Sequence, residues 1–300
     1  MQKYYHGLGR KGPYFEGWYV RLQTKDGRAL ALIPAYHRDQ EGQGSTSLQV
    51  ITGDGTWCVD YPESVFRAKP ERFFVRLGRN LFTDHGVSLS VETEGLTLAG
   101  NLQFGPLSPL HSDIMGPFRF LGEMECTHGV LSMCHSVTGT LCWNGCTVDF
   151  SGGLGYLETD RGRSFPQEYL WSQCAWLDGG QNGVMLAVAQ IPLGKLNFTG
   201  CISAVQYQGR QYTLTTYQGA KILRWSAQGA ILQQGDFRLE ATLLQDHGHS
   251  LHAPDDGKMT RTVRESVDAM VQYRFWEGQR LIFCREALCA GFEADCHQAT

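Results

Sequence analysis

Glycine-containing turns recur about every 8–12 residues along the chain, and each separates two short segments of alternating apolar and polar residues. The paired segments are 18–23 with 29–36, 47–51 with 56–59, 87–92 with 96–102, 130–142 with 147–150, 201–207 with 211–216, 221–226 with 230–234, and 270–275 with 280–284. Helical periodicity is nearly absent, and its best candidate, 262–273, is short and rich in β-branched residues. The pattern predicts an all-β fold of antiparallel hairpins arranged as barrels or sandwiches.

The turn at Asn144-Gly145 makes the most specific local prediction. Both residue types accept the positive φ that a two-residue type I′ hairpin requires. Such a turn places Trp143 opposite Cys146 and directs Cys142 to the other face of the sheet. We therefore expect no disulfide between these two cysteines, and we expect the ten cysteines to act as small core hydrophobes.

Two segments rich in glycine and proline interrupt the succession of hairpins, at 105–109 and at 152–166. The second interruption lies near the middle of the 300 residues. We therefore predict two β domains of similar size, 1–160 and 161–300, with a single large sandwich as the alternative architecture.

Composition excludes several classes of partner. The net charge is −4 and the basic residues form no stripe, which argues against nucleic acid. No stretch approaches the ~18 apolar residues of a membrane helix, and the first residues lack the pattern of a secretion signal. We expect a cytoplasmic protein with reduced thiols and no membrane span. The oligomeric state is left open.

Two groups of histidines and cysteines are candidate metal ligands, and we interpret both as structural. The first group is His247, His249 and His252, where no carboxylate or cysteine pattern completes a site, so a solvated loop is expected. The second group is Cys126, His128, Cys134 and His135, whose last two members point to opposite faces of a strand. We expect neither a metal nor a cofactor.

The segment 12–21 places a carboxylate on a strand face that is otherwise apolar. Alternation puts Glu16 with Trp18 on one face, and Tyr19 with Arg21 on the other. Burial raises the pKa of a carboxyl group, so Glu16 is a candidate general acid. The alternative is a structural glutamate bonded to a backbone turn or to an arginine.

The segment 155–173 places two carboxylates on one face of a strand. Glu158 and Asp160 share this face with Tyr156, while Tyr169, Trp171 and Gln173 share a face of the next strand. Like charges on one face repel unless a cation or a shared proton intervenes, and Arg161 and Arg163 are the nearby cations. An inter-domain salt bridge is the structural alternative to a functional site.

Together the two segments resemble the tocopherol cyclase family. Its members carry Phe-Glu-Gly-Trp-Tyr near the start, and a Glu-rich element that runs through Gly-x-x-Phe-Pro into a Trp-x-Gln strand. The matching residues here are Phe15, Glu16, Gly17, Trp18, Tyr19, Glu158, Gly162, Phe165, Pro166, Trp171 and Gln173. The chain departs at Thr159-Asp160-Arg161, where plant-type members carry Lys-Asn-Trp. The resemblance implies two lipocalin-like β domains, as in the related carotenoid hydratases.

These observations predict a site for an apolar or aromatic, isoprenoid-like small molecule near the domain junction. The expected chemistry is acid-assisted cyclisation, isomerisation or hydration of an alkene. Glu158 and Glu16 are the candidate acids, in one cavity and within ~12 Å of each other. Asp160, Arg161 and Arg163 are expected to set their protonation. The residues expected to line the pocket are Trp18, Tyr19, Tyr156 and Trp171, with Gln173 orienting a hydroxyl group.

Two other readings of the same residues remain open. A lipocalin-type carrier would bind a lipid or an aromatic metabolite without turning it over. A structural protein would use both motifs only to join its domains. A cavity above ~300 Å³ lined by both motifs favours binding or catalysis, and a filled junction favours the structural reading.

Overall fold

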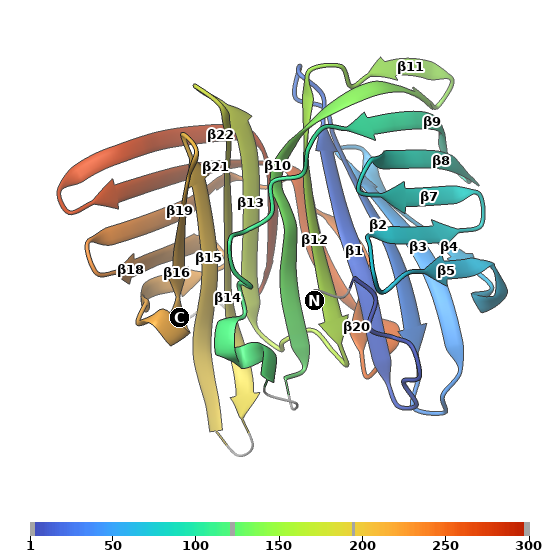
Figure 1. The fold of residues 1–300 in the computed structure, drawn as a ribbon, viewed down its shortest axis with the longest axis horizontal. Helices are drawn as coiled ribbons and strands as arrows, with labels where there is room; N and C mark the ends of the chain where they lie inside the picture. Colours follow the sequence, from blue (N-terminus) through green and yellow to red (C-terminus); the bar gives the residue numbers. More distant parts are fainter. Residues whose placement is uncertain (1–3, 121–123, 194–195, 297–300) are drawn as a thin grey trace.

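The computed structural model describes residues 4–120, 124–193 and 196–296, which form an all-β molecule (Figure 1). Within this part of the chain the strands make two antiparallel sheets, one of twelve strands and one of ten. The helical elements are 3₁₀ turns, η1 (Glu63–Val65), η2 (Gly116–Phe120) and η3 (Thr216–Gln218). No helix in the described residues has the length and apolar character needed to cross a membrane. The predicted all-β fold class is confirmed.

The first sheet has the order β4-β3-β2-β1-β12-β10-β9-β8-β7-β6-β5, with β11 paired to β10. Its strands are β1 (Tyr14–Gln23), β2 (Ala29–Arg38), β3 (Gly44–Thr52), β4 (Gly55–Tyr61), β5 (Phe66–Ala68), β6 (Phe74–Leu77), β7 (Asn80–Thr83), β8 (Gly86–Thr93), β9 (Leu96–Phe104), β10 (Cys126–Trp143), β11 (Cys146–Asp149) and β12 (Gly153–Gly162).

The second sheet has the order β16-β15-β14-β13-β22-β21-β19-β18-β17, with β20 paired to β21. Its strands are β13 (Tyr169–Leu177), β14 (Gln181–Leu193), β15 (Leu196–Tyr207), β16 (Arg210–Thr215), β17 (Lys221–Ser226), β18 (Gly229–Gln234), β19 (Phe237–Gln245), β20 (His249–Asp255), β21 (Lys258–Glu277) and β22 (Arg280–Asp295). The one predicted helix candidate, 262–273, lies inside β21.

The Asn144-Gly145 turn has the predicted geometry. Asn144 has φ 49° and Gly145 has φ 79°, the two positive values of a type I′ hairpin. Trp143 lies opposite Cys146, and Cys142 pairs with Thr147 instead. All ten cysteines are free thiols, but the expectation that they act as core hydrophobes is wrong for most of them. Only Cys134, Cys174 and Cys201 are buried.

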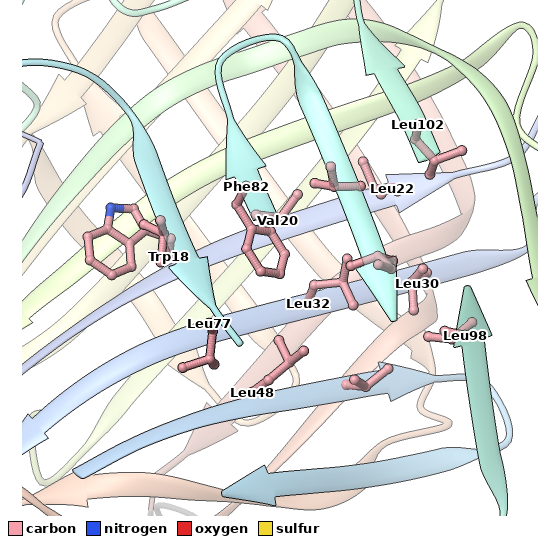
Figure 2. Close-up of a cluster of buried hydrophobic side chains, with 14 of the residues drawn as sticks. Trp18, Val20, Leu22, Leu30, Leu32, Leu48, Leu77, Phe82, Leu98 and Leu102 are labelled. Carbon is pink, nitrogen blue, oxygen red and sulfur yellow. The ribbon is translucent and has the colours of Figure 1, made fainter. Parts of the chain in front are cut away.

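Each sheet curls around its own apolar core, in a lipocalin-like arrangement. In the first sheet, alternate residues of β1 point inward, and Trp18, Val20 and Leu22 meet side chains from the short strands on the far side, such as Phe82 of β7 (Figure 2). The second sheet encloses a separate cluster that includes Tyr273. Burial of two such clusters gives each sheet an apolar interior of its own.

A third buried layer lies between the two sheets. It joins Tyr19 and Tyr156 of the first sheet to Tyr169, Trp171 and Met185 of the second. The chain passes from one sheet to the other between β12 and β13. The predicted glycine-rich break at 152–166 therefore contains a strand for most of its length, because Gly153, Gly155 and Gly162 belong to β12 rather than to a linker.

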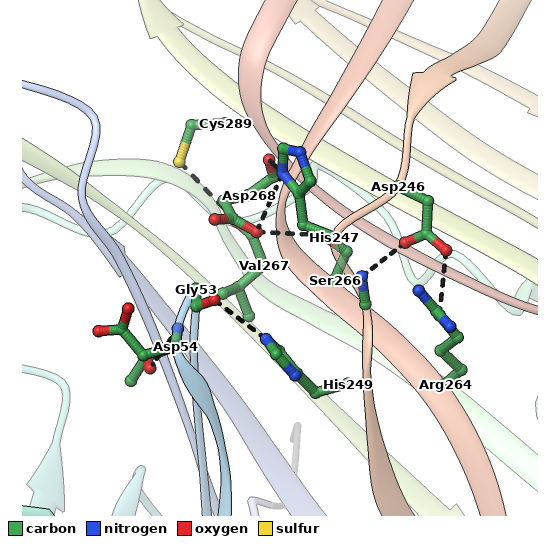
Figure 3. Close-up of polar contacts among 12 residues, drawn as sticks. Gly53, Asp54, Asp246, His247, His249, Arg264, Ser266, Val267, Asp268 and Cys289 are labelled. Carbon is green, nitrogen blue, oxygen red and sulfur yellow. Dashed lines mark hydrogen bonds and ion pairs between the residues drawn. The ribbon is translucent and has the colours of Figure 1, made fainter.

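The His247–His252 segment also differs from the expected solvated loop. His249 and His252 belong to β20, which lies against the first sheet. The His249 ring contacts the Gly53 carbonyl at 3.0 Å (Figure 3). The His252 amide donates to Gln49 at 2.9 Å. The His249 ring and the His252 backbone thus join the sheets, while the His247 side chain is exposed just before β20, as expected for a solvated loop. The reason is local pairing, because β20 forms a hairpin with β21 and so follows that strand to the junction.

Candidate functional site

A partly open cavity of about 190 Å³ lies between the two sheets, and we call it the junction cavity. Its wall draws on β1, β2, β10 and β12 of the first sheet and on β13, β14, β21 and β22 of the second. Most of the lining is apolar. The aromatic members are Phe15, Tyr19, Phe118, Phe165, Tyr169 and Trp171.

A carboxyl–imidazole group forms the most polar part of this wall. The Oε2 atom of Glu158 accepts hydrogen bonds from the Tyr156 hydroxyl and, at 3.2 Å, from Trp171 Nε1. His128 Nε2 lies 3.3 Å from the same oxygen, and His128 Nδ1 lies 2.9 Å from Asp160 Oδ1. The imidazole therefore bridges the two carboxylates.

Burial and charge shift the protonation of these groups toward neutral pH. Burial raises the pKa of Glu158 to about 7, against the lowering effect of His128. Burial lowers the pKa of His128, but the carboxylates of Asp160 and Glu158 outweigh it and raise that pKa to about 9. Near neutral pH, Glu158 therefore changes its protonation state beside a protonated imidazole.

The same three residues are the only described group that offers a cation three ligand atoms of this kind, all within 4.8 Å of one another. Both ring nitrogens of His128 already lie within 3.3 Å of a carboxylate oxygen, and such direct contacts leave no space for an ion between the imidazole and either partner. The arrangement fits a proton relay from Asp160 through His128 to Glu158 better than a metal centre.

Two further carboxyls face the cavity from the second sheet. Glu265 of β21 and Glu293 of β22 are directly opposite each other in the antiparallel pairing, and both side chains are buried. The Tyr19 hydroxyl donates to Glu265 at 2.5 Å, and the Tyr169 hydroxyl donates to Glu293. Burial is the main cause that raises the pKa of Glu265 well above its usual range, and the charge of Glu293 is the second. Burial is also the main cause that raises the pKa of Glu293 to about 8, with further contributions from the charges of Asp160 and Glu158.

A glycine positions the indole ring of the site. Trp171 pairs with Glu293 across the β13–β22 boundary, and its ring lies over Gly291. A Cβ atom at position 291 would lie 2.8 Å from the Trp171 ring, closer than real side chains approach. Gly291 therefore leaves the room that lets Trp171 reach Glu158.

Four of the predicted site residues line the cavity: Glu158, Asp160, Tyr19 and Trp171. Tyr156, Glu158 and Asp160 share one face of β12, as expected. Tyr156 does not line the cavity, but its hydroxyl donates a hydrogen bond to Glu158. Their positions agree with the alternation of β12 and β13. Their chemical roles stay predictions.

Glu16 does not share this cavity, and the prediction that it lies there with Glu158 is wrong. Strand alternation is the reason, because Tyr19 is the residue of β1 that pairs with Glu158, so Glu16 and Trp18 point to the opposite face. Glu16 is fully buried and accepts hydrogen bonds from the His6 amide at 2.8 Å and the Tyr14 hydroxyl at 2.7 Å. It holds the N-terminal segment over the first core, and Trp18 belongs to that core.

Arg161, Arg163 and Gln173 also lie outside the cavity lining. Arg161 pairs with Glu16 in the register, so it alternates away from Asp160. Arg163 is half exposed and its Nε lies 3.0 Å from Asp256. Gln173 is fully buried beyond the cavity, and neither atom of its amide has a hydrogen-bond partner among the described residues.

Sequence reasoning missed several polar residues of the cavity, and His128, Glu265 and Glu293 matter most for its chemistry. His128 was interpreted as structural because Cys134 and His135 diverge, but Cys126 and His128 alternate onto the cavity face on their own. Glu265 stands between Val263 and Val267 on an apolar face, which is the signal that drew attention to Glu16. Alternation thus marks a buried carboxylate without telling which of the two faces holds the site.

Comparison with known proteins agrees with this architecture. The sequence profile of the tocopherol cyclase-like family matches residues 113–294, more than half of the chain. No curated protein sequence matches the chain.

Several solved structures have the same fold at low sequence identity. CghA with Sch210972 aligns with a TM-score of 0.60 and 9% identity, over 95% of this chain and 90% of that chain. Kievitone hydratase from Nectria haematococca aligns with a TM-score of 0.52 and 9% identity, over 97% and 91%. An AttH-like protein from Nitrosomonas europaea aligns with a TM-score of 0.52 and 15% identity, over 93% and 91%. At such identities the likeness concerns the fold alone.

Proposed function

Because the chain belongs to the tocopherol cyclase-like family, we propose that its junction cavity binds a small apolar or aromatic molecule and catalyses acid-assisted chemistry on an alkene. The reaction is ring closure by an internal hydroxyl, a double-bond shift, or addition of water. The family name denotes a cyclase and one structural relative is named a hydratase, which supports this class of reaction.

One observation carries the proposal: Glu158 is a buried carboxyl that titrates near neutral pH inside an aromatic cavity. A general acid or base works best when its pKa lies near the working pH. Its neighbour His128 links it to the partly exposed Asp160, a path by which protons can reach solvent. Glu158 therefore has both the protonation range and the connection that proton exchange with a substrate requires.

The aromatic wall suits the intermediate of such a reaction. Protonation of an alkene carbon leaves a carbocation, and the faces of Tyr19 and Trp171 stabilise positive charge in a site with little water. The cation is quenched when a hydroxyl or water oxygen forms the new bond and releases its proton, or when a neighbouring carbon loses a proton. A carboxylate such as Glu158 accepts that proton, so the net change is isomerisation or hydration.

The size of the cavity limits the ligand. At about 190 Å³ it is smaller than the ~300 Å³ of typical small-molecule pockets. A compact molecule fits inside, and a longer isoprenoid-like molecule fits with its reacting end inside and its tail through the opening.

The buried ionisable groups distinguish this proposal from the carrier. A carrier for apolar molecules gains nothing from burying Glu158, Glu265 and Glu293 in its cavity, since each buried carboxyl costs free energy. A proton-transfer enzyme uses the same groups. The position of the acids in the cavity therefore favours catalysis over simple carriage.

Ligand capture tests the binding half of the proposal. Native mass spectrometry of the purified protein should detect a small apolar molecule bound in one copy per chain. Ala187→Phe fills the cavity and should abolish its retention. The matched control Ala99→Phe places the same ring on an exposed position of β9 and should retain the molecule. Equal retention by both variants would place the binding site elsewhere and reject the proposal.

A further inference from the structure

The second-sheet carboxyls of the junction cavity have an arrangement that differs from that of Glu158. We propose that Glu265 and Glu293 share one proton at neutral pH and form the proton donor of the cavity, while Glu158 is the group that receives the substrate's proton. The assignment of donor and acceptor rests on the proposed function. The inference that they share a proton rests on the pairing of β21 with β22.

The register of β21 and β22 forces the two carboxyls together. Glu265 and Glu293 are partners in this antiparallel pairing, and side chains that are directly opposite have Cβ atoms about 4.5–5.5 Å apart. Both side chains point to the cavity rather than to solvent. Two ionised carboxylates at this spacing repel, so a buried pair of this kind holds a proton between its members.

Within the described residues no cation forms an ion pair with either carboxyl. Arg21 lies on the same face as Tyr19, but its guanidinium donates to the carbonyls of Val267 and Cys289. Arg261 binds Asp295 and the carbonyls of the β12–β13 connection. The arginines therefore act on the pair only through their charge, without the direct contact that would let both glutamates ionise.

The groups that face the pair come from five strands. They are Tyr19 and Arg21 on β1, His128 on β10, Glu158 and Asp160 on β12, Tyr169 and Trp171 on β13, and Arg261 on β21. The carboxylates among them raise the pKa of the pair, and Tyr19, Tyr169 and the two arginines lower it, with burial the largest effect. Burial raises the pKa values of Glu158, Glu265 and Glu293 alike, so their different roles must come from their different bonding.

The bonding around Glu158 differs from the bonding around the Glu265–Glu293 pair. Its Oε2 atom accepts two hydrogen bonds, from Tyr156 and Trp171, and lies 3.3 Å from the imidazole of His128. Donors and a nearby cation favour the ionised form of a carboxyl. Among the described residues, Glu265 and Glu293 each accept a single hydrogen bond, from a tyrosine, and each lies near the charge of the other. The cavity thus has one carboxyl that favours the anion and a pair that retains a proton.

With the pair as proton donor and Glu158 as proton acceptor, every proton in the reaction is accounted for. The shared proton adds to one alkene carbon, and the substrate cation that forms beside the pair supplies the positive charge that lets both carboxyls ionise. A hydroxyl group, a water molecule or a carbon then loses a proton to the Glu158 carboxylate, and the product is neutral. The pair regains a proton from water at the opening of the cavity, and Glu158 releases its proton through His128 and Asp160.

Carbon NMR of the ligand-free protein tests the shared proton without any substrate. Glutamate is labelled with ¹³C at the side-chain carboxyl, and the two resonances are assigned with Glu265→Gln and Glu293→Gln. We expect the pair to titrate in two steps, the second above pH 7. In either variant the remaining carboxyl should titrate at least about one pH unit lower, because its like-charged neighbour is gone. Since the coupling is reciprocal, one folded variant suffices.

Glu286→Gln, an exposed change on the same strand, is the control and should leave both midpoints unchanged. Ordinary midpoints for both carboxyls below pH 6, or a midpoint that is the same with and without its neighbour, would overturn the proposal. A two-step titration in a protein that captures no ligand would leave the shared proton established and reject the proposed function instead.

Discussion

At the scale of single residues, alternation along strands decides which carboxyls meet. Glu16 and Glu158 belong to neighbouring strands and are both buried, yet they face opposite sides of the sheet. The sequence predicted the alternation within each strand correctly. It did not predict the register between β1 and β12, because pairing across 142 positions depends on the packing of the whole sheet.

The raised pKa values make a prediction about stability and pH. His128, Glu158 and Glu293 all bind protons more tightly in the folded protein than their ordinary pKa values imply. The folded state therefore binds more protons than the unfolded state, and stability falls as the pH rises. We expect the free energy of unfolding to drop by several kcal/mol between pH 6 and pH 9.

Urea denaturation at constant ionic strength measures this drop. Glu293→Gln should reduce it, since that variant removes one group that gains a proton on folding, and Glu286→Gln should not. A protein that is more stable at pH 9 than at pH 6 would contradict the protonation states described for the cavity.

Gln173 allows a test of a buried amide without partners. Neither amide atom is hydrogen-bonded within the described part of the chain, and the side chain is fully buried. Gln173→Met keeps the shape and removes the unpaired polar atoms, so stability should stay equal or rise by about 1 kcal/mol. Thermal denaturation gives the change. A loss of more than about 2 kcal/mol would show that the amide has a bonding role after all.

At the scale of strands, irregular pairing within the second sheet leaves carbonyl groups free to bond to the first sheet. The register of β21 with β22 shifts between Ser266 and Ala269 and again between Ala269 and Val271. Bulges of this kind leave carbonyl groups without ladder partners. The buried guanidinium of Arg21 donates hydrogen bonds to two such carbonyls, Val267 at 2.7 Å and Cys289 at 2.9 Å.

Arg21→Leu should therefore weaken the junction. The change removes both hydrogen bonds and leaves buried carbonyls unpaired, so we expect a loss of about 2–4 kcal/mol in the free energy of unfolding. Arg21→Lys keeps a donor and should lose less. Urea denaturation of the two variants provides the values, and a loss below about 1 kcal/mol for Arg21→Leu would show that Arg21 is not a junction residue.

The sequence predicted the hairpins well because their signals are local. Glycine turns, alternation and the Asn144-Gly145 geometry need only neighbouring residues. The site depends on contacts that no local pattern encodes. Tyr19 reaches Glu265 over 246 positions, and Tyr169 reaches Glu293 over 124. For that reason Glu265 and Glu293 were missed, although each is a carboxylate on an apolar strand face.

At the scale of the whole molecule, two curled sheets with separate cores enclose a largely apolar cavity that contains a few carboxyl groups. The third buried layer takes residues from both sheets, and β20 of the second sheet lies on the first (Figure 1). The carboxyls of the cavity are likewise divided, with Glu158 in the first sheet and the Glu265–Glu293 pair in the second. The proposed chemistry therefore requires both sheets in contact.

Deuterium exchange into the captured molecule tests the central claim most directly. The purified protein is incubated in D₂O with the molecule that it retains, and mass spectrometry follows deuterium bound to carbon. Wild-type protein should introduce deuterium at a carbon of the ligand. Glu158→Gln keeps the shape of the side chain but cannot accept or donate the proton, so it should slow the exchange by on the order of 10²-fold or more. A wild-type protein that binds the molecule without exchange, or a Glu158→Gln variant within about threefold of wild type, would contradict the account.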